Sequence, residues 1–120
     1  MKIAVTAQGN TLDSPMDPRF GRASYILVVE TETLEFEAFD NATNKNAFKG
    51  AGIQAAAAIS DRDVEVLITG YCGPNAFKTL EAAGVKVVSD QDGRVIDVVQ
   101  KFKQGEAVFA SQPNKDGHWQ

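Results

Sequence analysis

The chain has 120 residues, 43% of them hydrophobic, which is enough for one globular domain with a core of its own. Its formal net charge of −4 at pH 7 argues against general nucleic-acid binding, because that function needs a cluster of basic side chains. No apolar run approaches the roughly 20 residues that span a bilayer, and no basic leader precedes the first strand pattern, so we expect a soluble cytoplasmic protein without a membrane partner.

Three strand patterns open the chain. A β-branched run at residues 2–6 predicts a central strand, which ends at a turn signal around Gly9. Residues 24–30 and 34–39 flank a short polar segment, and this predicts an antiparallel hairpin. The second arm of the hairpin alternates between apolar and acidic residues, as an edge strand with one solvated face does. The apolar face would hold Leu34, Phe36 and Ala38, and the solvated face Glu35 and Glu37.

Helices and strands alternate in the rest of the chain. Apolar residues at helical spacing predict a helix at about residues 48–60. Strands at 64–70 and 85–88 enclose a helix at about 76–83, and together they predict a right-handed parallel βαβ unit. Apolar residues at i, i+3, i+4 and i+7 then predict an amphipathic helix around 95–102.

The element order is therefore β-β-β-α-β-α-β-α, which predicts an α/β fold with a mixed five-stranded sheet flanked by helices. We expect one domain at residues 1–105. Residues 106–120 end in a polar segment rich in turn formers, and we expect them to form a flexible tail.

The connection at residues 7–22 carries the clearest binding signal. It is far longer than the median loop of roughly 4 to 6 residues, and it closes with Asp17-Pro18-Arg19-Phe20-Gly21-Arg22. Arg19 and Arg22 offer forked donors, and the glycines let backbone N–H groups approach a ligand, so the loop suits an anion. The alternative is a solvated loop in which Asp13 and Asp17 neutralise both arginines.

A second loop, Gly70-Tyr71-Cys72-Gly73-Pro74-Asn75, places a thiol just before a helix N-terminus, where a thiolate or a bound anion is favoured. Cys72 is the single cysteine, so one chain forms no internal disulfide and no two-cysteine zinc site. The thiol can equally pack as a small apolar residue. Because parallel strands direct their ligand sites to their carboxyl ends, we expect this loop and the 7–22 loop to form a cleft.

The two loop sequences, Asp17 to Arg22 after the first strand and Thr69 to Phe77 before a helix, resemble the dinitrogenase iron-molybdenum cofactor-binding family. The similarity runs from about residue 1 to 105. Length, acidity and the Gly-Pro-Asn-Ala-Phe segment are most similar to the small single-domain members that hold a molybdenum-copper sulfide cluster. The resemblance implies a ribonuclease H-like fold, which agrees with the element order above.

For function, the resemblance implies a non-catalytic carrier of an anionic metal-sulfide cluster. The cluster would be of the molybdenum-copper type, or alternatively an iron-molybdenum or iron-sulfur cluster. It would lie in the cleft between the 7–22 and 70–75 loops and would be held mainly by charge and hydrogen bonds. Arg19 and Arg22 would balance its charge and face the second loop, and Cys72 is the one candidate metal ligand. The predicted cofactor-binding residues are Gly9, Asn10, Ser14, Arg19, Phe20, Gly21, Arg22, Gly70, Tyr71, Cys72, Gly73 and Asn75.

Two functions of other classes stay open. One is a cofactor-free interaction or regulatory module that works with a P-loop ATPase partner. The other is a small-anion enzyme that uses Cys72, which is disfavoured because no histidine base accompanies the thiol in the sequence and Lys78 stands where a phosphate-binding loop would need an arginine. We expect a monomer that binds no nucleic acid.

Overall fold

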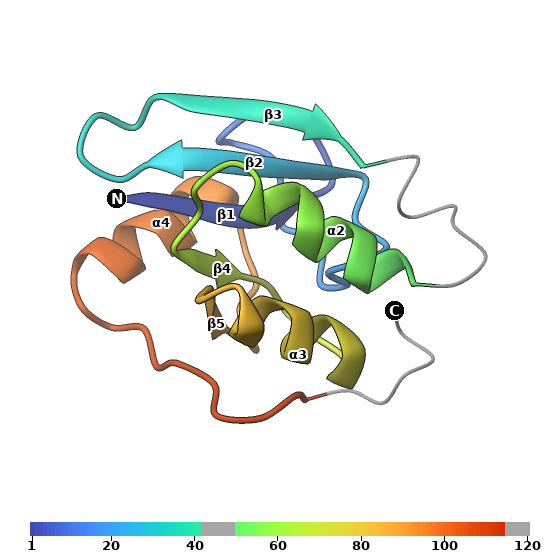
Figure 1. The fold of residues 1–120 in the computed structure, drawn as a ribbon. Coiled ribbons are helices and arrows are strands. Elements are labelled where there is room, and N and C mark those ends of the chain that lie inside the picture. Colours follow the sequence, from blue (N-terminus) through green and yellow to red (C-terminus); the bar gives the residue numbers. More distant parts are fainter. Residues whose placement is uncertain (42–49, 115–120) are drawn as a thin grey trace.

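The computed structural model describes residues 1–41 and 50–114. Its elements follow one another in the predicted order, and a five-stranded sheet lies between two helical layers (Figure 1). Helices α2 and α3 cover one face of the sheet and α4 covers the other. The predicted ribonuclease H-like α/β fold is confirmed. The elements are β1 (Lys2–Ala7), β2 (Tyr25–Glu30), β3 (Phe36–Asp40), α2 (Ala51–Ser60), β4 (Val66–Ile68), α3 (Pro74–Ala82), β5 (Lys86–Val88) and α4 (Val95–Lys103).

The sheet has the strand order β3-β2-β1-β4-β5, so β1 is central as predicted. Strand β1 pairs antiparallel with β2, from Lys2 opposite Glu30 to Ala7 opposite Tyr25. It pairs parallel with β4 on its other side, and β4 pairs parallel with β5. The three parallel strands end at the same edge of the sheet. The loops that follow β1 and β4 therefore leave the sheet as neighbours.

The core is divided between the two faces of the sheet because successive strand residues point in opposite directions. On β1, Ala4 packs with the helices α2 and α3, whereas Ile3 and Val5 pack with α4. The amphipathic stripe predicted for the last helix is confirmed, since Val95 and Val99 of α4 are fully buried there.

The second arm of the hairpin is the edge strand β3, as predicted, but its apolar face differs from the prediction. Leu34 adopts a left-handed conformation with φ of 64° and belongs to the turn, so the strand begins only at Phe36. Leu34 and Ala38 pack toward α4, whereas Phe36 remains 42% exposed. Phe39 points to the opposite face and lies under the Arg62 guanidinium, 4.0 Å from the ring centroid.

Helix α2 begins later than the sequence predicts. Gly50 has a φ of 73°, a left-handed conformation that glycine adopts without steric cost, and the helix starts at the next residue. Phe48, which the prediction included, lies outside the described residues. None of the described helices is long and apolar enough to cross a membrane.

The segment after α4 returns to the sheet. The Ala110 N–H donates to the Val87 carbonyl at 2.7 Å, which places this segment along the outer side of edge strand β5. The Lys86 ammonium lies 5.0 Å from the Phe109 ring centroid. Of the predicted flexible tail, residues 106–114 thus include contacts with β5, while His118 and Trp119 lie outside the described residues.

Candidate functional site

The loops after β1 and β4 are joined by backbone hydrogen bonds. The Tyr71 N–H donates to the Pro18 carbonyl at 2.6 Å, and the Phe20 N–H donates to the Tyr71 carbonyl at 3.2 Å. These bonds form a short parallel bridge between Arg19 and Tyr71. Gly70 makes the approach possible, because a Cβ atom there would lie 2.7 Å from the Pro18 carbonyl oxygen. The two predicted loops therefore meet directly.

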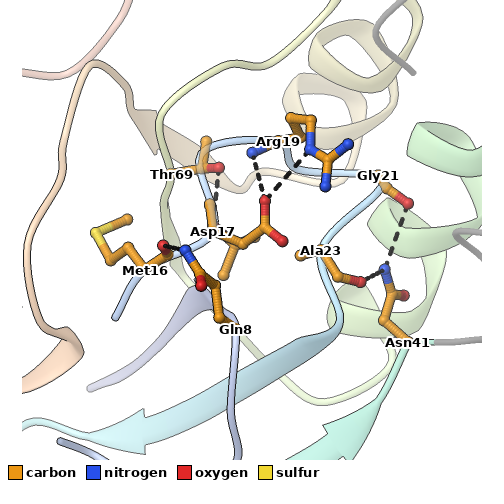
Figure 2. A network of polar contacts seen from close by, with 9 residues as sticks. Gln8, Met16, Asp17, Arg19, Gly21, Ala23, Asn41 and Thr69 are labelled. Carbon is orange, nitrogen blue, oxygen red and sulfur yellow. Dashed lines mark hydrogen bonds and ion pairs between the residues drawn. The ribbon is translucent and has the colours of Figure 1, made fainter. Parts of the chain in front are cut away.

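A buried polar network fixes the start of this contact (Figure 2). The Thr6 hydroxyl donates to the Asp17 carbonyl at 2.7 Å and lies 2.9 Å from the Thr69 hydroxyl. The Asp17 N–H in turn donates to the Thr6 carbonyl at 3.0 Å. Thr6 is the last residue but one of β1 and Thr69 follows β4, so the network ties the ends of the two strands and the loop together.

Asp17 is buried and holds Arg19. Its Oδ1 accepts the Arg19 N–H at 3.1 Å and lies 3.5 Å from the Arg19 Nε. Asp13 has a different partner, since it lies 3.4 Å from Arg94. Of the two neutralising carboxylates considered above, Asp17 is thus paired with a loop arginine and Asp13 with an arginine of another element. The Arg19 side chain is 46% exposed, so its far end remains open to a ligand in solution.

The end of the loop lies across the first turn of α2. A Cβ atom on Gly21 would lie 2.5 Å from the Gly52 nitrogen, so only a glycine lets the chain pass this close to the helix start. The buried Asn41 amide supports the passage by donating to the Ala23 carbonyl at 2.9 Å and the Gly21 carbonyl at 3.4 Å (Figure 2). Arg22 follows at a half-buried position.

Two helix N-termini point to this region. Helix α2 begins after Gly50 and α3 begins after Gly73, and the two helices start on the same side of the molecule (Figure 1). Glycine has no side chain, so neither Gly50 nor Gly73 can cap the first amides of its helix with a side chain. The macrodipoles add a positive potential at both starts. Together with Arg19, this arrangement can bind an anion.

Helix α4 differs from these two helices. Its first amides are already used, because the Val95 N–H donates to the Ser14 carbonyl at 3.0 Å and the Ile96 N–H donates to the Leu12 carbonyl at 2.9 Å. The 7–22 loop therefore has two parts. Residues 8–16 cover the start of α4 and residues 17–22 meet the second loop.

This division separates the predicted site residues. Ser14 contacts the start of α4 through its carbonyl, and Gly9 packs on Ser14, whose Oγ would lie 2.5 Å from a Cβ atom at position 9. Asn10 is exposed in the same part of the loop. The structure thus places Gly9, Asn10 and Ser14 with α4. The residues that it brings together around the bridge are Arg19, Phe20, Gly21, Arg22, Gly70, Tyr71, Cys72 and Gly73.

The aromatic residues of the two loops differ in exposure. Phe20 is buried in the core between the sheet and the helices α2 and α3. Tyr71 is 37% exposed and can contact a ligand at the bridge. Asn75 is exposed in the first turn of α3.

Cys72 is 1% exposed and packs in the same core as Phe20. Desolvation by burial raises the pKa of its thiol to about 12. At neutral pH the side chain is therefore a protonated, apolar group, the second of the two interpretations that the sequence allowed. Its role as a metal ligand stays a prediction, and ligation would require loss of both the proton and the surrounding cover.

The predictions from sequence missed two polar residues behind the second loop. The Asp90 N–H donates to the Gly70 carbonyl at 2.9 Å, and Asn114 bonds both Gly70 and Cys72. Asn114 falls in the segment for which we expect a flexible tail, and neither residue lies near the loop in sequence. Among the described residues, no group of three His, Cys, Asp or Glu side chains is placed to hold a metal ion.

The fold and the site thus define a class of protein, a ribonuclease H-like domain in which two loops at the carboxyl ends of β1 and β4 are suited to an anion. Residues 1–105 match the family model described as dinitrogenase iron-molybdenum cofactor, and the chain belongs to this family. The resemblance inferred from the two loop motifs is confirmed.

Solved structures of similar chains agree with this assignment. The apo form of the orange protein from Desulfovibrio gigas is 46% identical, with 95% of this chain and 96% of that chain covered and a TM-score of 0.92. A putative NifB protein from Thermotoga is 31% identical, with coverage of 95% and 97% and a TM-score of 0.82. A putative dinitrogenase from Methanocaldococcus jannaschii, 16% identical with coverage of 94% and 97% and a TM-score of 0.69, shares the fold. No curated protein sequence matches the chain.

Proposed function

We propose that this protein is a non-catalytic carrier of an anionic metal-sulfide cluster, which binds where residues 17–22 meet residues 70–75. Family membership and the likeness to the orange protein support a cofactor-carrying role in general. The observation that carries the proposal is the pair of glycine-capped helix starts, α2 and α3, beside the half-exposed Arg19.

The chemistry of these donors fits a sulfide cluster as cargo. The outer sulfides of such a cluster accept hydrogen bonds and carry negative charge, and backbone amides at helix starts bind anions. The guanidinium groups of Arg19 and Arg22 supply charge-assisted donors. Ordinary iron-sulfur sites use several thiolates, whereas this chain has one cysteine, and its thiol is buried and protonated at neutral pH. The cluster would be held by charge and hydrogen bonds.

We propose a molybdenum-copper sulfide cluster as the cargo, the type that the resemblance to the small single-domain family members implies. The likeness to the orange protein, which covers nearly the whole chain, supports this choice. The family description favours an iron-molybdenum cluster as the alternative. Donors of this kind respond to charge, size and acceptor geometry. They do not read the identity of the metal, so metal analysis of the loaded protein is the measurement that distinguishes the two clusters.

The test is reconstitution with tetrathiomolybdate and copper(I), followed by visible absorption and metal analysis after gel filtration. Wild type should retain a coloured, metal-containing species, and the double variant Arg19→Gln/Arg22→Gln should lose most of it. The control is Lys101→Gln/Lys103→Gln, which removes the same charge from exposed positions in the last turn of α4. Equal retention by all three proteins would overturn the site, and no retention by wild type would overturn the carrier function.

A further inference from the structure

Asn114 is bonded to the second loop through both its side chain and its backbone. Its Nδ2 donates to the Gly70 carbonyl at 2.9 Å and to Asp90 Oδ1 at 3.1 Å. Its Oδ1 accepts the Cys72 N–H at 2.8 Å. Its own N–H donates to the Cys72 carbonyl at 3.2 Å. One residue of the C-terminal segment thus makes four hydrogen bonds behind the proposed cluster site.

These bonds complete a strand-like arrangement. Residues 70–72 lie between two partners and use successive backbone groups on opposite sides, as a central strand does. The Tyr71 N–H and carbonyl bond to residues 18 and 20 on one side. The Gly70 carbonyl and both backbone groups of Cys72 bond to Asn114 on the other side. Asn114 supplies what a neighbouring strand would otherwise supply.

The loss of the bonds to Cys72 would cost more free energy than the loss of an exposed bond, because this residue is buried. A buried backbone group without a partner costs free energy comparable to a lost hydrogen bond. The next residue is Gly73, from which α3 begins. A displacement of Cys72 therefore moves the first amides of α3, which face the proposed ligand.

The segment that carries Asn114 is itself attached to the domain. The Ala110 N–H bonds to Val87, and the Ala110 side chain packs against the core that contains Cys72. This segment lies beyond the family match, which ends at residue 105. The contacts that Asn114 makes with the second loop thus come from outside the part of the chain that matches the family.

We infer that Asn114 is a positioning residue of the cluster site, which fixes the Gly70–Gly73 backbone and the start of α3 in the form that receives the anion. The effect on cluster binding rests on the proposed function. The effect on the loop does not, and this difference separates the two in an experiment.

The loop effect can be measured without any cluster. Cys72 is the single thiol of the chain, so labelling of the native protein with a thiol reagent such as dithionitrobenzoate reports on its cover. Asn114→Ala should accelerate labelling by about tenfold or more, because the Cys72 N–H loses its partner and the Gly70 carbonyl keeps only the bond from Asp90. Amide hydrogen exchange should accelerate at Cys72 and remain unchanged at Val5 in the centre of the sheet. The control is Gln112→Ala, an exposed residue of the same segment.

Cluster retention is then measured with tetrathiomolybdate and copper(I). Asn114→Ala should release the cluster about tenfold faster than wild type or Gln112→Ala. Wild-type rates of labelling and exchange in Asn114→Ala would overturn the inference, and so would accelerated labelling with unchanged cluster release. Failure of wild type to take up any cluster would overturn the proposed function and leave the loop measurement valid. If Asn114→Ala does not fold, Asn114→Asp replaces it for labelling and cluster release, since this variant loses both side-chain donors and places a second carboxylate beside Asp90 Oδ1. It keeps the acceptor for the Cys72 N–H, so exchange at Cys72 is not used as its readout.

Discussion

Asp17 Oδ1 accepts the Arg19 N–H and also lies beside the Arg19 guanidinium, so one buried carboxylate oxygen holds both the backbone and the side chain of the residue two positions on. This contact places a negative charge close to the proposed site of an anion. It orients the arginine and at the same time offsets part of its charge.

Asp17→Asn should therefore strengthen anion binding. Asparagine keeps an oxygen that can accept the Arg19 N–H but removes the charge. We expect the affinity for tetrathiomolybdate, measured by titration at low salt, to rise by about threefold to tenfold, or roughly 0.6 to 1.4 kcal/mol. Asp13→Asn is the matched control, because it makes the same charge change at the exposed pair with Arg94. Equal effects of the two variants would contradict a local role for Asp17.

Gly70→Ala should destabilise the fold at the bridge between the loops. The new Cβ atom would lie 2.7 Å from the Pro18 carbonyl oxygen and 2.8 Å from its Cα, and backbone atoms can yield only if the loops separate. We expect the free energy of unfolding, measured with urea, to fall by about 2 kcal/mol.

The comparison for this variant is Gly9→Ala. Its Cβ atom would meet only the Ser14 side chain, which can turn aside. We expect a loss below about 1 kcal/mol. A smaller loss for Gly70→Ala than for Gly9→Ala would show that the two loops are not held in the contact described here.

The contact between the buried hydroxyls of Thr6 and Thr69 predicts that substitutions at these two positions are coupled in their effect on the free energy of unfolding. Thr6→Val removes the donor to the Asp17 carbonyl and the bond to Thr69, whereas Thr69→Val removes only the second. Both residues are fully buried, so we expect losses of about 1 to 3 kcal/mol for Thr6→Val and less for Thr69→Val. The double variant, measured by urea unfolding, should lose less than the sum of the two. Strict additivity would show that the hydroxyls do not interact.

Cys72 predicts a loss of stability at alkaline pH. Burial raises the pKa of the thiol from its ordinary value of 9.0 to about 12 in the folded protein. Above pH 9 the unfolded chain loses this proton while the folded chain keeps it, so the contribution is fully present below pH 9 and is lost as the pH rises toward 12. The slope would be at most about 1.4 kcal/mol per pH unit.

Comparison of wild type with Cys72→Ala isolates this contribution, because the other titrating groups are shared. The difference in free energy of unfolding between the two proteins should be constant from pH 7 to 9 and shift in favour of the alanine variant from pH 9 to 11. A constant difference over the whole range would show that the thiol is accessible to water.

The fold followed from the sequence because burial leaves a regular pattern. The stripe that contains Val95 and Val99 predicted α4, and the alternation in the second arm of the hairpin predicted an edge strand. The bounds were less accurate where a single backbone angle decides them. Gly50 and Leu34 adopt left-handed conformations, and α2 and β3 begin after them.

The site followed only in part, for a physical reason. The positions of Arg19 and Tyr71 could be predicted because each follows a parallel strand, and parallel strands end together. The division of the 7–22 loop could not, because it depends on long-range backbone bonds such as that from Val95 to Ser14. Asn114 left no signal either, since one asparagine in a turn-rich segment has no periodicity and its partners in the second loop, Gly70 and Cys72, lie more than forty residues earlier.

The backbone bond from Ala110 to Val87 has a consequence for the solubility of the molecule. Strand β5 is one edge of the sheet, and an uncovered edge can pair with a strand of another molecule. The segment after α4 covers the outer side of β5 at this point. A chain that ended at residue 105, where the family match ends, would expose that edge and would be prone to self-association.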